Sequence, residues 1–214
     1  MLLADGDHVE RDYYDARYVT IGGQVESPSH EVQHAAMQRL ASIFYTGVPG
    51  KVSVVGHGDT QWANAKLDGA VRFTPITDKL AHWQIKLRCP NPAKFGGLNS
   101  FTFAHSVPGF VLHYGSYEAY PVVTVTGYAS AGYTITTTTG SFVVTQALVT
   151  ANPHRIDMRT GVLTINGAPQ VGAVSSGRPL TIPPNKRITW SVESRIPVSS
   201  TPPSITIDVY DTYI

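Results

Sequence analysis

Histidines and carboxylates are the side chains of this 214-residue chain that could bind a metal ion or transfer a proton. His30 and His34 stand four residues apart, so on a helix they would share one face and could hold a metal ion. No third ligand follows at matching spacing, and two solvated histidines are therefore expected. Cys89 is the single cysteine, which excludes an intrachain disulfide and a cysteine-based zinc site. We predict neither a metal site nor a bound cofactor.

Catalytic patterns are absent from the sequence or incomplete. The glycine-rich stretch from Gly56 to Asp59 lacks the Lys-Ser/Thr pair that grips phosphate and magnesium, so it is read as a turn. No Gly-x-Ser-x-Gly nucleophile motif occurs. Asp157 and Asp208 lie on separate expected strands, and glycosidase chemistry would require them to converge. A Ser/His/Asp triad assembled from distant loops remains an alternative that the sequence does not exclude. The chain is nevertheless predicted not to be an enzyme.

Trp190, Arg187 and Asn185 form one candidate carbohydrate contact. An exposed aromatic ring flanked by Arg and Asn side chains is an arrangement that can bind sugar on a β-sandwich. Against this, Trp190 alternates with Ile188 and Val192, which places its ring on the same side as two apolar side chains and favours the core. A carbohydrate-binding module is therefore the alternative function and not the preferred one.

The charge of the chain is low and evenly spread. Sixteen Lys and Arg residues against fifteen Asp and Glu residues give a net charge of +1. No run of basic residues resembles a nucleic-acid footprint, and the short cluster at 185–187 is typical of a solvated turn. Only 14% of residues are charged, well below the roughly 25% of an average soluble domain. The sequence contains no uninterrupted run of 18 apolar residues, the length that a membrane-spanning helix requires, so no membrane insertion is expected.

A helix is expected near the start of the chain, after a strand over 18–25. Ser27 is its expected N-cap and Pro28 its first helical residue, as both types favour those positions. A stripe of apolar residues at helical spacing would then face a sheet, and it consists of Val32, Ala36, Leu40, Ile43 and, at its end, Phe44.

Strands are expected along most of the remaining chain. Segments 51–55, 62–67, 70–75 and 82–89 carry alternating apolar residues, and Asp68-Gly69 favours a hairpin between the second and third of them. Trp83 lies on the apolar side of the last of these strands. The sequence pattern changes near residue 106, since no helical periodicity occurs beyond it. We place a domain boundary there, with domains at 1–105 and 106–214. Beyond it, strands and hairpins recur every eight to twelve residues, which indicates a β-sandwich or barrel, at 121–126, 133–138, 142–145, 155–158, 162–165, 180–182, 187–192 and 204–210.

The chain resembles phage distal tail proteins and related minor tail proteins, because it contains three motifs in the order in which they occur in that family. The first is the strand over 17–23 that runs into the expected helix. The second is the strand 83–89 with its exit Pro90 to Gly96, and the third is the segment 115–127, which resembles the opening of the family's second domain. The hairpin at 155–167 also fits that domain. The resemblance spans about residues 11–210.

The resemblance implies a fold and a role. The fold would be mainly β, with an N-terminal β-barrel-like sheet domain bearing one helix, followed by a galectin-like β-sandwich. The role would be that of a structural virion component at the tail tip or baseplate, made in the host cytoplasm. Copies of the chain would form a ring, expected to be hexameric, that joins the tail tube protein to tail tip or receptor-binding proteins. DNA would be a partner only as cargo that passes through the channel of the ring.

Overall fold

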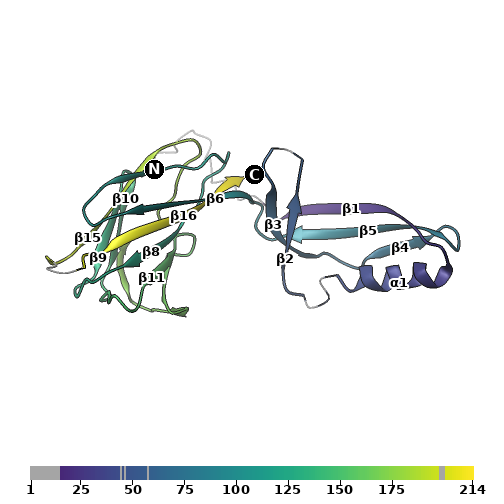
Figure 1. Cartoon of the computed structure of the whole chain (residues 1–214), viewed down its shortest axis with the longest axis horizontal. Coiled ribbons are helices and arrows are strands. Elements are labelled where there is room, and N and C mark those ends of the chain that lie inside the picture. Colours follow the sequence, from purple (N-terminus) through teal and green to yellow (C-terminus); the bar gives the residue numbers. More distant parts are fainter. Residues whose placement is uncertain (1–14, 44, 46, 57, 198–200) are drawn as a thin grey trace, which may run out of the picture. The chain divides into compact units, whose positions relative to one another are not determined.

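The chain folds into two compact units in the computed structural model, which describes residues 15–214 except 44, 46, 57 and 198–200. The first unit contains the described residues up to Val54 and Trp62–Pro92, and the second contains Val55–Gln61 and Ala93–Ile214 (Figure 1). Both units are built mainly from strands, and the described part of the chain contains a single α-helix. The mainly β fold with one helix that was expected is confirmed.

The first unit is one curled antiparallel sheet with a helix beside it. Strand β5 lies at its centre and pairs with β1 along ten residues and with β3 and β4 at its two ends, while β2 adds to β3. Figure 1 shows β2 and β3 running at a steep angle to β1 and β5, so this sheet curls. The elements are β1 (Arg17–Glu26), α1 (His30–Ala41), β2 (Gly50–Val54), β3 (Gln61–Leu67), β4 (Arg72–Pro75) and β5 (Leu80–Cys89).

The helix contacts the rest of the first unit through a face that includes Leu40 of the expected stripe but has Gln33 in place of Val32 at its start. Val32 is 48% exposed, whereas Gln33 is buried and its amide donates a hydrogen bond of 3.0 Å to the Thr77 carbonyl. Leu40 packs against the small core of the sheet. Apolar spacing alone did not reveal this face because a polar side chain with a buried partner stands at its start.

The helix also begins later than expected. Its N-cap is Ser29, whose hydroxyl accepts from the Val32 N–H, and Pro28 precedes the cap. Ser27 is buried instead, and its N–H donates to the Lys79 carbonyl at 2.8 Å. The expected cap at Ser27 is thus wrong by two residues. Phe44, the expected end of the stripe, lies outside the described residues.

The hairpin predicted around Asp68-Gly69 does not form, because β3 and β4 both pair with β5 and not with each other. The dipeptide instead carries the chain along β5. The Asp68 N–H donates to the Lys86 carbonyl at 2.8 Å, and the Asp68 carboxylate pairs with the Lys86 ammonium at 2.9 Å. Gly69 adopts a positive φ of 87°, a backbone conformation that favours glycine. This conformation accounts for a glycine at position 69 although no hairpin forms there.

The second unit is a β-sandwich of two antiparallel sheets, as expected for the C-terminal half. The strand order is β6-β16-β8-β11-β12-β13 in one sheet and β14-β10-β9-β15-β7 in the other. The strands are β6 (Lys94–Phe103), β7 (Gly109–Val111), β8 (Val122–Thr126), β9 (Tyr133–Thr137), β10 (Gly140–Val144), β11 (His154–Asp157), β12 (Val162–Ile165), β13 (Ala168–Pro169), β14 (Val174–Gly177), β15 (Ile188–Ser194) and β16 (Ser204–Tyr213).

Two of the sandwich hairpins match the sequence prediction closely. Strands β9 and β10 pair across Thr138 and Thr139, and β11 pairs with β12. Asn166 and Gly167 form the two-residue turn between β12 and β13, with φ values of 49° and 81°. Two consecutive positive φ values are the requirement of a type I′ turn, which Asn-Gly satisfies best.

The boundary between the units lies at Pro92/Ala93 and not at 105/106. The difference is β6, which follows the boundary and pairs with β16 from Lys94↔Tyr213 to Phe103↔Ile205. Its sequence contains Gly96-Gly97 and few β-branched residues, so β6 shows little strand signal of its own. Its place in the sandwich comes from pairing with a strand more than a hundred residues away.

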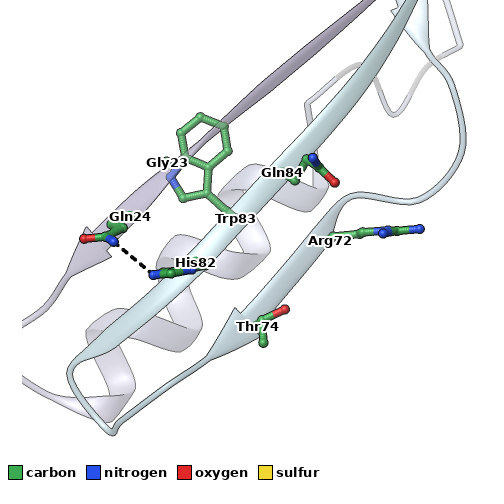
Figure 2. Close-up of a pocket in the computed structure, with 7 residues that line it drawn as sticks. All are labelled: Gly23, Gln24, Arg72, Thr74, His82, Trp83 and Gln84. Atoms are coloured by element: carbon green, nitrogen blue, oxygen red, sulfur yellow. Dashed lines mark hydrogen bonds between the residues drawn. The ribbon is translucent and has the colours of Figure 1, made fainter.

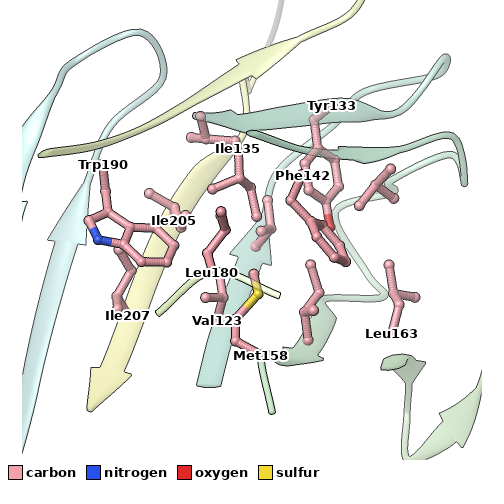
Figure 3. Close-up of a cluster of buried hydrophobic side chains, with 14 of the residues drawn as sticks. Val123, Tyr133, Ile135, Phe142, Met158, Leu163, Leu180, Trp190, Ile205 and Ile207 are labelled. Carbon is pink, nitrogen blue, oxygen red and sulfur yellow. The ribbon is translucent and has the colours of Figure 1, made fainter. Parts of the chain in front are cut away.

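The core of the sandwich lies between its two sheets (Figure 3). Trp190 and Ile135 come from one sheet and Ile205 and Ile207 from the other, and all four side chains are fully buried. Tyr133 and Phe142 extend the same core. Apolar residues at every second position of a strand lie on one face of its sheet. The apolar faces of the two sheets therefore pack against each other as two layers.

Two buried histidines are part of this sandwich. His113 has both ring nitrogens engaged: Nε2 lies 3.1 Å from the Ile182 carbonyl, and Nδ1 accepts from the Gly115 N–H at 3.1 Å. His154 Nδ1 lies 3.1 Å from the Tyr133 hydroxyl. Burial lowers the pKa of both histidines and outweighs the backbone hydrogen bonds, and at His113 also the Asp211 carboxylate, that favour the charged form.

We expect truncation of Trp190 to destabilise the sandwich strongly. Trp190→Ala should lower the free energy of unfolding by about 3–5 kcal/mol, because a fully buried ring leaves a cavity. Chemical denaturation followed by circular dichroism measures this. Tyr114→Ala is the matched control, since Tyr114 is 68% exposed and should change stability little. Equal losses in the two variants would show that Trp190 is not a core residue.

We also expect stability to fall in mild acid. The unfolded histidines titrate near 6.5, about the ordinary value, whereas the folded pKa values of His113 and His154 are lower. The unfolded chain therefore binds protons first, so stability is fully present above pH 6.5 and is lost as the pH falls from there toward the lower pKa values of the folded state.

The test of this pH dependence is the melting temperature between pH 7.5 and 5. It should fall with pH in the parent chain and fall less steeply in His113→Gln and in His154→Gln. His30→Gln, on the exposed side of α1, should keep the slope of the parent. A parent melting temperature that does not change with pH would contradict the account.

Candidate functional site

The long edge of β1 is the first candidate for a functional surface. β1 pairs with β5 over all ten residues from Arg17 to Glu26 and is the outer strand of its sheet among the described residues. In an antiparallel strand every second residue directs its N–H and C=O away from the partner strand, so this edge presents unpaired groups. It carries no proline, one of the devices that usually block such an edge.

One face of the first unit's sheet is polar and open, and we call it the polar face. It is defined by Thr20 and Gln24 of β1 and by His82, Gln84 and Lys86 of β5, all of them exposed. The opposite face carries the apolar residues of the same strands, including Val19, Ile85 and Leu87.

Two shallow depressions of about 480 and 510 Å³ lie on the polar face and share Arg72 and Gln84. Figure 2 shows the first of them, where the Gln24 amide lies 3.0 Å from His82 Nε2. Most of their lining residues are polar or glycine, and neither is an enclosed cavity. They are suited to contact with an extended polar partner and not to burial of a small apolar ligand.

Trp83 stabilises the strand pair beneath this face. Its indole lies against Gly23, and a Cβ at position 23 would meet the ring at 3.0 Å (Figure 2). An aromatic ring over a glycine of the neighbouring strand compensates for the side chain that the glycine lacks. Trp83 was expected on the apolar side of its strand, and it packs against the small core there.

Cys89 closes that same small core and offers no reactive site. The thiol is buried. Burial raises its pKa, and the nearby Arg17 only partly offsets this effect. A thiol held in the protonated form is a poor nucleophile and a poor metal ligand.

The predicted sugar-contact residues are not gathered on the surface. Trp190 is fully buried in the sandwich core, so its ring cannot stack on a sugar. Arg187 and Asn185 are exposed in the turn that precedes β15. The alternation with Ile188 and Val192 had indicated the buried position, and both of these residues are buried beside it.

Asp157 and Asp208 lie in the same row of one sheet, opposite Val122 of the strand between them. Two strand spacings put them roughly 10 Å apart. Each carboxylate already has a local partner: Asp157 accepts from the Arg159 N–H at 2.8 Å, and Asp208 accepts from the Ser100 hydroxyl. They serve as local hydrogen-bond acceptors, and the sequence could not show that they share a row.

His30 and His34 are both exposed on α1. No group of three or more His, Cys, Asp or Glu side chains suitable for a metal ion occurs among the described residues. In the same part of the chain, no helix is long and apolar enough to cross a membrane.

Comparison with known proteins gives a match in structure and none in sequence. No family model and no curated protein matches the chain. The crystal structure of the Dit protein (gp 19.1) of phage SPP1, described as a paradigm of the hub adsorption apparatus in phages that infect Gram-positive bacteria, matches with a TM-score of 0.75 and 9% identity. The match covers 100% of this chain and 86% of the SPP1 chain.

A second solved structure, the phage P2 baseplate in its activated conformation, matches with a TM-score of 0.49 and 9% identity, over 90% of this chain and 78% of the other. At 9% identity, the likeness to the SPP1 Dit structure establishes the fold alone. The fold implied by the resemblance to phage distal tail proteins is therefore confirmed: this chain has the fold of the SPP1 Dit hub protein.

Proposed function

We propose that this chain is a structural, non-catalytic component of a phage tail and that its copies assemble into a hub at the tail tip of the virion. The observation that carries the proposal is the match over the whole chain to a hub protein. The hub would be a ring of the expected six copies, made in the host cytoplasm, that joins the tail tube to tail tip or receptor-binding proteins and lets DNA pass through its channel.

The first unit supports assembly by its incomplete burial. Its core of buried residues is small and consists mostly of Ala63, Ala65, Ile85 and Leu87. Ile21 and Val54 of its strands remain 39% and 51% exposed. A thin sheet of this kind gains stability when a second copy covers its apolar surface or extends its edge.

The β1 edge is the contact that we assign to the ring. In a closed ring each subunit presents two different and complementary surfaces. An open strand edge is one such surface, because it pairs with a strand of the neighbouring copy through backbone hydrogen bonds alone. The second unit would then be free to contact other tail components.

No specific observation favours the carbohydrate-binding alternative. Its proposed aromatic platform, Trp190, is fully buried, so its ring cannot stack on a sugar.

Light scattering of the purified chain over a concentration series tests the proposal. We expect a mass of six times 23.1 kDa. A strict monomer at every concentration would overturn the ring.

Proline substitutions at two adjacent positions of β1 test the assigned contact. Consecutive residues point their N–H groups to opposite edges, so one of Thr20→Pro and Ile21→Pro removes a donor from the open edge and the other removes one facing β5. The variant that loses the donor on the open edge should dissociate the ring with a nearly unchanged melting temperature. The variant that loses the donor facing β5 should mainly lower the melting temperature. If both variants keep the parent mass while folded, the contact lies elsewhere.

A further inference from the structure

Basic residues that are scattered in the sequence gather on the polar face of the first unit. Lys86 and Arg88 alternate along β5, Lys66 pairs with Arg88 across the β3–β5 ladder, and Arg72 pairs with Gln84 across the β4–β5 ladder. Directly paired residues place their side chains on the same face of a sheet, so these four cations share the polar face. Lys51 of β2 joins them, since its ammonium lies 4.5 Å from the centre of the Trp62 ring, on the side of β3 opposite the buried Ala63 and Ala65.

Carboxylates are scarce on this face. Glu26 at the end of β1 and Asp68, which pairs with Lys86, are the acidic residues beside the five cations in the described part of the first unit's strands and of the β3–β4 connection. Five positive and two negative groups leave a net charge of +3, whereas the whole chain carries +1. The positive charge is therefore a local property that the fold creates.

We propose that the polar face binds the phosphate backbone of double-stranded DNA without reading its sequence. Phosphate contacts are made by Lys and Arg together with amide and hydroxyl side chains, and Gln24, Gln84 and Thr20 supply such groups between the cations. The ten-residue β1–β5 ladder spans roughly 30 Å. That is the length of about nine phosphates along one strand of B-DNA, at 3.4 Å each.

The side chains of this face favour DNA over an acidic protein. Protein interfaces are centred on buried aromatic or aliphatic anchors and are depleted in lysine. The two aromatic rings on the polar face, Tyr18 and Trp62, each have a lysine ammonium over them, at 4.8 and 4.5 Å. Such rings are also poorly placed for stacking on single-stranded bases, so the duplex backbone is the partner that fits.

The binding measurement uses the full chain and a labelled random-sequence 30-base-pair duplex, with fluorescence anisotropy at 50 to 200 mM salt. If every cation contacts a phosphate, the slope of log K against log salt approaches about −4.5 per chain. We expect the double variant Lys66→Gln/Arg72→Gln to lower the magnitude of this slope by about 2 and to weaken binding equally for unrelated sequences.

The matched control is Lys186→Gln/Arg187→Gln, which removes the same charge from an exposed turn of the second unit and should keep the slope. Melting temperatures confirm that all variants are folded. No binding at 50 mM salt, the same loss of slope in the control, or equally tight binding of a poly-glutamate peptide of matched charge would each overturn the proposal.

This inference goes beyond the hub function and can fail separately from it. DNA binding is read from the anisotropy of the duplex, and ring formation is read from the mass of the chain without DNA. A ring that does not bind DNA refutes only the DNA-binding face, whereas a monomer that binds DNA refutes only the ring.

Discussion

The ten-residue ladder between β1 and β5 is the interaction on which the functional surfaces of this protein depend. Because its register is unbroken over ten residue pairs, Tyr18, Thr20 and Gln24 of β1 lie directly beside Arg88, Lys86 and His82 of β5. One consequence is the polar face with its basic residues. The other is an outer strand whose second edge is unpaired in the part of the chain that the structure describes. A slip by one residue would exchange the two faces and bury charge, so the alternation of apolar residues holds the register in place.

The two units bury their apolar surface very differently, and this difference suits an assembling protein. The sandwich is closed by β16, which lies between β6 and β8 and buries Ile205, Ile207 and Val209 completely. Its core is fully buried between its own two sheets. The first unit has a core made largely of alanines and short aliphatic chains and leaves apolar strand residues exposed. We infer that the sandwich folds as an independent body, whereas the first unit reaches full stability only beside its neighbours.

Sequence reasoning found most strands and failed where the structure depends on distant pairing. Strands such as β5 and β15 were predicted because their alternation is strict, and the same alternation placed Trp190 in the core. The strand β6 was missed because Gly96 and Gly97 carry no strand signal, and the domain boundary was displaced with it. The Asp68-Gly69 hairpin was wrong because local turn propensity cannot reveal that β5 inserts between two strands. Likewise, the basic face could not be predicted, since sequence shows runs of charge but not the register that gathers separated residues.

The ordered resemblance of three motifs predicted the fold that the match at 9% identity confirms. The central claim is that this fold is used here for a closed ring. Electron microscopy of the purified chain in negative stain tests it most directly. The account predicts closed rings with six-fold symmetry and a central opening. Isolated particles of single-chain size at concentrations well above those of the light-scattering series would contradict it.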